Sequence, residues 1–486
     1  MNSGDTHTNS ILSDSPKNVH REEFPFWRIV LWSLGGVGST IIGSLTGLMT
    51  YFYVPPETSQ AAFPQYLSNQ TILGLTLVGL IGYIGGLLVI AFNPFISTWS
   101  DRSKSRIGRR KVFMIVSFLP ISVLSYLMFA PPVDHVSTVN AVWLFAIIIM
   151  LNIFRATYGV SGALIPEFGS KSKIIMRFST FGAIGWVLGY IIGSQLIFMI
   201  KDAFVSSGMS PLAAFRLTVG GLIAISTLFL LLQILVVDEK RYGTGKSSTV
   251  ALWPALKLTF QNRTFVLYTL TNQVYYWGDG FFQTGLLYFV TIIFGLSEAM
   301  LFPFGATLLG VAFVIYPIVP IIAKRTGNKL LYQVALLIMF IVMIIFAWAD
   351  KIPVSANILP WIIVLIIAIP SAITGIIPGA INNEIVREDC LRTGVAKEAS
   401  FNAAAGLITA IPGGFVGLIM PSLLLLGKSQ ANPLGVRTVA MVSAACMFGA
   451  FVMLQFFYNE KKLKAETLKK IALDKNTIFK QNQLTC

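Results

Sequence analysis

Residues 101–111 read DRSKSRIGRRK and hold six lysines and arginines in eleven positions. Long apolar stretches flank this segment at residues 71–97 and 112–130, each long enough to cross a bilayer as a helix. Charge of this density is too costly to place in hydrocarbon. The segment is therefore predicted to be a short loop at one face of a membrane.

The composition of the whole chain agrees with a membrane protein. Of the 486 residues, 55% are hydrophobic and only 12% are charged. A soluble domain could not cover so much apolar surface with so few charges. The formal net charge of +15 does not indicate a nucleic-acid partner, because the basic residues gather in the predicted loops of one membrane side.

The distribution of basic residues predicts the orientation. With loops assigned from hydropathy, 30 of the 36 lysines and arginines fall on one side. The positive-inside rule then places both termini in the cytoplasm and requires an even number of crossings. We expect a multi-pass protein of the cytoplasmic (inner or plasma) membrane, with some attraction to anionic membrane lipid.

Reading apolar runs bounded by charge, proline or glycine gives twelve helices. The predicted fold is all-α: two six-helix bundles at 27–236 and 263–457, with cytoplasmic segments at 1–26, 237–262 and 458–486. The N-terminal segment is polar and is interpreted as a tail and not as a signal peptide. The expected helices are 27–53, 71–98, 112–131, 140–165, 177–199, 212–236, 263–295, 300–323, 329–350, 358–385, 399–426 and 434–457.

The two bundles share short sequence features. The predicted second helix is followed by Arg106-x-Gly108-x-Arg110, and the eighth by Arg-x-Gly-x-Lys at 325–329. Glu167 follows the fourth helix and Glu384 ends the tenth. Such an echo predicts parallel halves related by an axis along the membrane normal, with a solute site between them near the midplane.

Two ionisable residues fall well inside predicted helices: Arg155 in the fourth and Asp279 in the seventh. A charge at the bilayer centre costs roughly 2.5–3.5 kcal/mol on insertion scales, so both are expected to face the interior. Three roles remain open. In the first, Asp279 carries a coupling proton. In the second, Arg155 clamps a substrate carboxylate by bidentate hydrogen bonds. In the third, the two residues form a permanent ion pair between the halves.

Amide and aromatic side chains surround Asp279 along the seventh helix. Aromatic faces stack on sugar rings, and amides give the directional hydrogen bonds that hydroxyls need, so we expect some of these side chains to touch a sugar-like solute. The candidates are Asn272, Tyr276, Trp277 and Gln283. No histidine lies in a predicted helix, no HExxH motif is present, and the three cysteines are scattered. Neither an enzyme nor a metal or cofactor site is predicted.

The charged loop is also a candidate gate. Asp101 ends the second helix, and Arg102, Arg106, Arg109 and Arg110 follow it around Gly108. Arginines in this position can form bonds between helices that break when the inner side opens. We assign Glu167 and Glu384 to matching places in the two halves of this gate.

Three stretches resemble one transporter family: NPFISTWSDRSKSRIGRRK at 93–111, ALIPEFGSKSKIIMRFSTFGAIG at 163–185 and LRTGVAKEASFNAAAGL at 391–407. The chain resembles the glycoside–pentoside–hexuronide:cation symporters of the major facilitator superfamily, the group of melibiose permease. The resemblance covers all twelve helices and implies a carrier that moves a sugar or related solute with a cation. It also implies a role for Glu398, which matches the family's glutamate in the third stretch.

Several positions depart from that family. Asn93 stands where melibiose permease-like members have a cation-binding acid, and Thr40 and Tyr158 replace the sugar-binding acids. We still expect Asn93, Thr40 and Tyr158 to form or flank the binding site. Ala410 stands near the expected lysine. A carboxylate site for sodium is therefore not evident. Coupling to a proton through Asp279 and uncoupled facilitated transport both stay open, and a proton is favoured over sodium.

The sequence thus predicts a monomeric secondary transporter that moves a sugar, glycoside or hexuronide by proton symport. Two alternatives stay open. In the first, the same fold carries a lysophospholipid, nucleoside or peptide-like solute; in the second, the chain is a membrane sensor that binds a solute without moving it.

Overall fold

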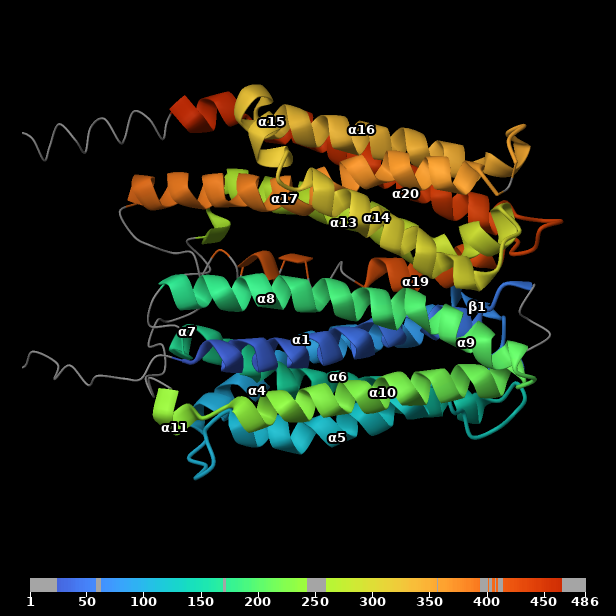
Figure 1. The fold of residues 1–486 in the computed structure, drawn as a ribbon, viewed down its shortest axis with the longest axis horizontal. Coiled ribbons are helices and arrows are strands. Elements are labelled where there is room, and N and C mark those ends of the chain that lie inside the picture. Colours follow the sequence, from blue (N-terminus) through green and yellow to red (C-terminus); the bar gives the residue numbers. More distant parts are fainter. Residues whose placement is uncertain are drawn as a thin grey trace, which may run out of the picture.

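The computed structural model describes residues 24–57, 63–168, 172–242, 259–355, 357–393, 401, 404–406, 408–409 and 414–465. Nearly all of these residues are helical, and the helices run side by side along the long axis of the molecule (Figure 1). The described residues up to 242 form one half, and the described residues from 259 onwards form the other.

The N-terminal half contains the helices that pack around α1 and α6. Polar caps set several of their starts: Ser210, for example, accepts from the Ala213 N–H and precedes a proline at the first position of α10. The elements are α1 Phe26–Gly47, α2 Met49–Tyr53, β1 Thr71–Ile72, β2 Leu75–Thr76, α4 Leu77–Arg102, α5 Lys111–Leu127, α6 Thr138–Gly159, η1 Val160–Leu164, α7 Ile165–Phe168, α8 Ser172–Ile191, η2 Ile192–Leu196, α9 Ile197–Ser206, α10 Pro211–Val236 and α11 Glu239–Tyr242.

The C-terminal half is built around α13, which packs on α20. Asn262 caps α13 by accepting a 3.0 Å hydrogen bond from the Phe265 N–H. The elements are α13 Arg263–Tyr288, η3 Phe289–Ile293, η4 Glu298–Met300, α14 Leu301–Ile315, α15 Val319–Thr326, α16 Asn328–Ala347, η5 Ala349–Lys351, α17 Leu359–Thr393, α19 Phe415–Leu424 and α20 Leu434–Phe457.

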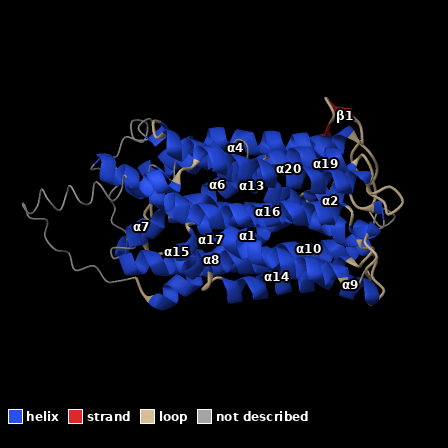
Figure 2. Cartoon of the chain, turned by 90° about the horizontal axis from the view of Figure 1, so that it is seen from above, coloured by secondary structure: helices blue, strands red, loops and turns tan. Residues whose placement is uncertain are grey.

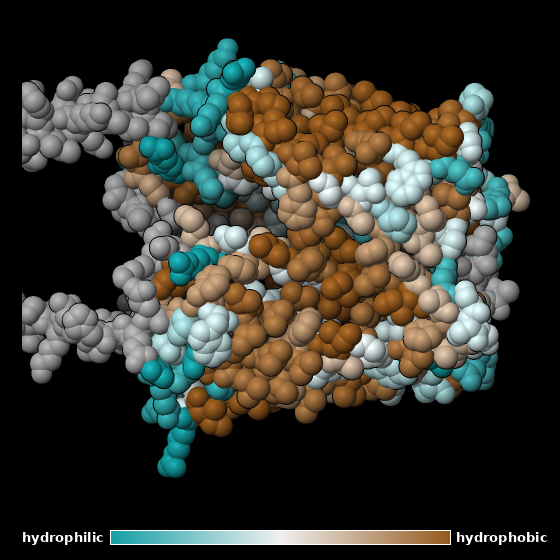
Figure 3. Space-filling view, viewed as in Figure 1, coloured by the Kyte–Doolittle hydropathy of each residue, from teal (hydrophilic) through white to brown (hydrophobic). Residues whose placement is uncertain are grey.

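Both ends of the described chain lie at the same end of the molecule, which we call the tail end (Figure 1). The opposite, distal end carries the β1–β2 hairpin (Figure 2). Brown apolar surface covers the middle of the molecule, and hydrophilic side chains gather at its two ends (Figure 3). Nine helices of the described chain are long and apolar enough to cross a membrane. The molecule is an integral membrane protein.

The two halves touch along α4 with α19 and along α8, η2 and α9 with α14. Glycines allow close approach there: a Cβ on Gly79 would lie 2.5 Å from the Leu418 carbonyl oxygen, and one on Gly305 would lie 1.7 Å from Gln195 Oε1. Hydrogen bonds between the halves gather at the distal end. Examples are Tyr288 Oη to the Val54 carbonyl at 2.8 Å and Lys428 Nζ to the Pro55 carbonyl at 2.6 Å.

The structure corrects several predicted helix limits. Residues 71–76, expected in the second helix, form an antiparallel hairpin whose turn holds Leu73 and Gly74 at positive φ. The fifth helix continues through η2 and α9 to Ser206, so Lys201, which was assigned to a loop, is helical and buried. The tenth helix reaches Thr393, and most of residues 399–413 lies outside the described residues.

Candidate functional site: a cavity between the halves

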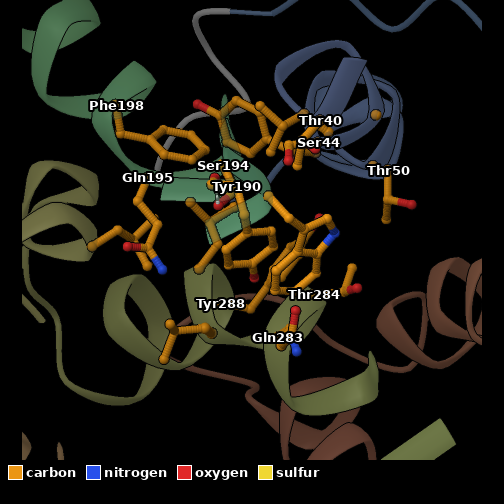
Figure 4. Close-up of a pocket in the computed structure, with 18 of the residues that line it drawn as sticks. Thr40, Ser44, Thr50, Tyr190, Ser194, Gln195, Phe198, Gln283, Thr284 and Tyr288 are labelled. Carbon is orange, nitrogen blue, oxygen red and sulfur yellow. Dashed lines mark hydrogen bonds between the residues drawn. The ribbon is translucent and has the colours of Figure 1, made fainter. Parts of the chain in front are cut away.

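A cavity of about 440 Å³ lies between the halves, from the middle of the helices towards the distal end. Its walls come from α1, α8, η2, α9 and α13, whose side chains converge in Figure 4. The volume is within the range of small-molecule sites. The lining residues are Ser39, Thr40, Gly43, Ser44, Gly47, Leu48, Thr50, Tyr51, Arg155, Trp186, Tyr190, Ser194, Gln195, Phe198, Gln283, Thr284, Leu286, Leu287, Tyr288 and Leu301.

Helix α1 supplies a polar face of small residues. Thr40, Ser44 and Gly47 recur at helical spacing and line the cavity one turn apart. The Thr40 hydroxyl donates a hydrogen bond to the Gly36 carbonyl at 2.9 Å. The lone pairs of the hydroxyl oxygen can still accept hydrogen bonds from other groups. The face offers hydroxyls and room for a solute, as a polar small molecule requires.

Helix α8 supplies an aromatic wall. Trp186 and Tyr190, one turn apart, stack with ring centroids 5.7 Å apart and planes inclined by 11°. Ser194 follows one turn further and donates to the Tyr190 carbonyl at 2.6 Å. An apolar ring face of a sugar can stack on such aromatic rings, while its hydroxyls reach the polar groups beside them.

Gln195 is a buried amide in the π-helical segment η2. The residue is 8% exposed and lines the cavity, and its Oε1 has no hydrogen-bond partner among the described residues. An unpaired buried acceptor costs free energy that a hydrogen-bond donor on a solute would recover. Short π-helical segments occur frequently at functional sites.

Arg155 reaches the cavity from α6. Its Nη2 would lie 3.2 Å from a Cβ on Gly43, so the missing side chain of Gly43 leaves room for the guanidinium. Within the described part of the chain, Arg155 makes no hydrogen bond or ion pair. A guanidinium in this setting is a ready site for a planar anion such as a carboxylate.

Asp279 lies behind the cavity wall on α13 and accepts a hydrogen bond from Gln283, which lines the cavity. Asp279 and Arg155, both described, form no ion pair with each other in this conformation. Each charge instead faces the interior from a different half.

A smaller cavity of about 280 Å³ adjoins the first inside the N-terminal half. Arg155 and Ser39 line both cavities. Tyr158 lines only the smaller one, and its hydroxyl contacts the Gln233 Oε1 at 2.8 Å and the Leu230 carbonyl at 3.1 Å. Tyr158 therefore anchors α6 to α10.

Four other predicted solute contacts lie outside both cavities. Asn272 accepts a 3.0 Å hydrogen bond from the Tyr332 hydroxyl, and Trp277 packs on Phe415 with centroids 4.8 Å apart. Asn93 and Tyr276 are exposed, Tyr276 to 50%. Of the nine predicted binding residues, the large cavity thus brings together Thr40, Arg155 and Gln283, with Asp279 directly behind Gln283.

The wall of α8 and η2 was missed by the sequence reading. Neutral polar and aromatic residues there do not stand out as charges do. Their spacing of four residues, at Trp186, Tyr190 and Ser194, is the signal that would have indicated a shared face.

At the tail end, Glu167 binds the two arginines of the predicted gate that directly precede α5, Arg109 and Arg110. Arg109 Nη2 lies 2.7 Å from Glu167 Oε1, and Arg110 pairs with the same carboxylate. Glu239 accepts a 2.8 Å hydrogen bond from the Arg110 N–H and another from Lys111, and so caps α5. Gly108, at φ +141°, lies against Glu239, where a Cβ would be 3.0 Å from its Oε1.

The C-terminal half repeats this arrangement with other side chains. Glu384 accepts from Asn328 Nδ2 at 2.9 Å, and Glu460 caps α16 through the N–H groups of Asn328 and Lys329. Burial alone would raise the pKa of Glu460, but hydrogen bonds from Lys464 and from these N–H groups hold it below its usual value. Glu167 and Glu384 therefore occupy matching places.

The remaining predicted gate residues lie elsewhere. Arg102 and Arg106 are exposed at the tail end and form no ion pair within the described residues. Asp101 lies in the last turn of α4, and its side chain is outside the described part. Glu398 also lies outside the described residues.

Comparison with known proteins agrees with this geometry. The structure is similar to the nucleoside transporter NupG (12% identity, TM-score 0.60, covering 89% of this chain and 99% of that one). It is also similar to a D-xylose–proton symporter (15% identity, TM-score 0.59, covering 90% of this chain and 98% of that one). A third similar structure is that of a bacterial homologue of the human lysosomal transporter Spinster, inward-facing and unoccupied (13% identity, TM-score 0.61, covering 92% of this chain and 99% of that one). At these identities the likeness establishes the fold alone.

These neighbours and the two-half architecture confirm the predicted major facilitator fold, a class of membrane transporter. A family model described as MFS/sugar transport protein matches residues 31–458. The chain belongs to this family. No curated protein matches the sequence.

Proposed function

We propose that the chain is a proton-coupled symporter for a sugar-like solute with an acidic group, such as a hexuronate or hexuronide. The observation that carries this proposal is Arg155, a guanidinium that lines the cavity without a partner in the described chain. A carboxylate would satisfy it with charge-assisted hydrogen bonds. The hydroxyls of α1 and the rings of Trp186 and Tyr190 would hold the rest of the solute.

Asp279 would carry the proton. It lies on the opposite half from Arg155, and Gln283 connects it to the cavity. Protonation neutralises a buried carboxylate and so lowers the cost of enclosing it as the halves close around the solute. Solute and proton would then cross together.

Alternating access would move the solute and the proton between the two sides of the cytoplasmic membrane. The termini would lie in the cytoplasm. The bonds between the halves at the distal end favour an arrangement closed on that side. Figure 3 shows the molecule hollowed between its halves at the tail end. Arg102 and Arg106 would find partners when the tail end closes.

An uptake panel in proteoliposomes tests this proposal. Purified protein is given radiolabelled glucuronate, a neutral glycoside, a nucleoside, a dipeptide and a lysophospholipid, each with an inward proton gradient. We expect accumulation of glucuronate, and a loss of roughly ten- to a hundredfold in its apparent affinity in Arg155→Gln, because a hydrogen bond to a charged group contributes about 1.5–3 kcal/mol. Uptake of one of the other solutes alone, or binding without flux, contradicts the proposal.

A further inference from the structure

A buried cluster of polar groups joins the two halves at the distal end. Lys201 of α9 forms an ion pair with Glu298 of η4, and the two residues are 5% and 6% exposed. The hydroxyl of Tyr51, on α2, lies 2.9 and 2.8 Å from the two carboxylate oxygens of Glu298 and accepts from Lys201 Nζ at 3.3 Å. Lys201 and Tyr51 belong to one half and Glu298 to the other.

The surroundings leave little room for water. Lys201 Nζ lies 5.8 Å from the ring centroids of both Tyr51 and Phe198. Opposite charges enclosed in this way attract strongly. Removal of Lys201 takes away the positive charge that Glu298 faces, whereas removal of Glu298 leaves Lys201 beside the partly exposed carboxylate of Asp202, 3.5 Å away. The cluster therefore favours contact between the halves as long as both charges are present.

The cluster also forms the roof of the cavity. Tyr51 and Phe198 line the cavity on one side and contact the ion pair on the other (Phe198 is seen in Figure 4). Beside it, Ser297 of one half donates to Asp202 of the other at 2.7 Å. A solute can pass between the cavity and the distal side only if the halves separate here and water reaches both charges.

We propose that Tyr51, Lys201 and Glu298 form a distal latch that holds the cavity closed on the distal side, and that Tyr51 connects the latch to the solute. A solute group that binds the Tyr51 hydroxyl takes it from Glu298 and weakens the latch. Occupancy of the cavity thereby lowers the barrier to distal opening. The inference needs the two halves to move, but it does not depend on which solute or ion is carried.

Cysteine labelling tests the latch. In the full chain with its cysteines replaced, Ser44→Cys places a thiol on the cavity wall, and an impermeant maleimide is added to sealed vesicles whose outer surface carries the distal end. Glu298→Gln and Lys201→Met should raise the labelling rate by at least about tenfold, because each removes the buried ion pair that joins the halves. Tyr51→Phe should also raise it, by roughly tenfold, because a hydrogen bond to the charged carboxylate of Glu298 is lost.

Two further variants separate the latch from a general loss of structure. Asp202 lies 3.5 Å from Lys201 Nζ and would repel a glutamate at position 201. In an Asp202→Asn background, exchange of the charges by Lys201→Glu together with Glu298→Lys should therefore return the rate towards that of the background protein. Asp350→Asn breaks another ion pair at the distal end, in which Asp350 lies 2.6 Å from Arg437. Both of these residues belong to the C-terminal half. Its labelling rate should stay unchanged. Unchanged labelling in the latch variants, or an equal increase in Asp350→Asn, would overturn the proposal.

Discussion

Gln283 lines the cavity and donates a hydrogen bond to Asp279, one turn earlier on α13. An amide that donates to the carboxylate stabilises its ionised form. When the solute draws the amide away, this stabilisation is lost. The pair thus offers a direct route by which solute binding and protonation of Asp279 influence each other.

Asp279→Asn should abolish accumulation driven by a proton gradient while solute exchange continues. The amide cannot gain or lose a proton, but it keeps the shape and the contact with Gln283. Uptake under an imposed pH gradient and counterflow without one, both in proteoliposomes, measure the two activities. Accumulation equal to that of the parent protein would remove Asp279 from the coupling mechanism. Asp350→Asn, at the distal surface, provides the matched control.

Gln195→Leu should weaken solute binding roughly five- to tenfold, because one hydrogen bond of about 1 kcal/mol is lost. Without solute, the melting temperature should stay the same or rise, since the amide oxygen that is removed is unpaired in the empty cavity. Calorimetry measures the affinity for the solute, and thermal unfolding with and without solute measures the melting temperature. A lower melting temperature with unchanged affinity would mean that Gln195 is only a packing residue.

Gly79→Ala should weaken the contact between α4 and α19, because the new methyl group would lie 2.5 Å from the Leu418 carbonyl oxygen. We expect a loss of about 1–3 kcal/mol in stability, as for other overpacked contacts. Gly86→Ala, on the same helix, meets nothing within 4 Å and should be neutral. Thermal unfolding in detergent compares the two, and equal melting temperatures would argue against this close contact.

Glu460→Gln should cost about 1 kcal/mol at neutral pH through the loss of the charged cap on α16. The pKa of Glu460 is lowered in the folded protein, so its contribution is present above the usual value of 4.5 and is lost as the pH falls through the lowered pKa. The difference in stability between parent and variant should therefore vanish only in strong acid. Thermal unfolding as a function of pH measures it, and a difference that persists there would refute the cap's charge as its cause.

The helical fold was accessible from the sequence because each span carries its own apolar pattern. The loop around Gly108 and the charges at Arg155 and Asp279 were found because charge is conspicuous in an apolar chain. The hairpin at 71–76 was missed because a short apolar strand and a helix end have the same composition.

The distal cluster could not be found in this way. Lys201 and Glu298 are 97 positions apart and lie near helix ends, where hydropathy assigns charged residues to loops. Their pairing depends on how the two halves pack. The same holds for Gln195, whose burial depends on the π-helical segment and on the space that Gly305 leaves.

Movement of the two halves against each other is the central claim, and distances between spin labels measure it most directly. One label pair joins the halves at the distal end, at the exposed residues Val136 and Val354, and another joins them at the tail end, at Ile107 and Leu330. When glucuronate and protons are added, we expect the distal distance to lengthen and the tail-end distance to shorten in a fraction of the molecules. If the solute binds and both distances stay the same, alternating access between these halves is contradicted.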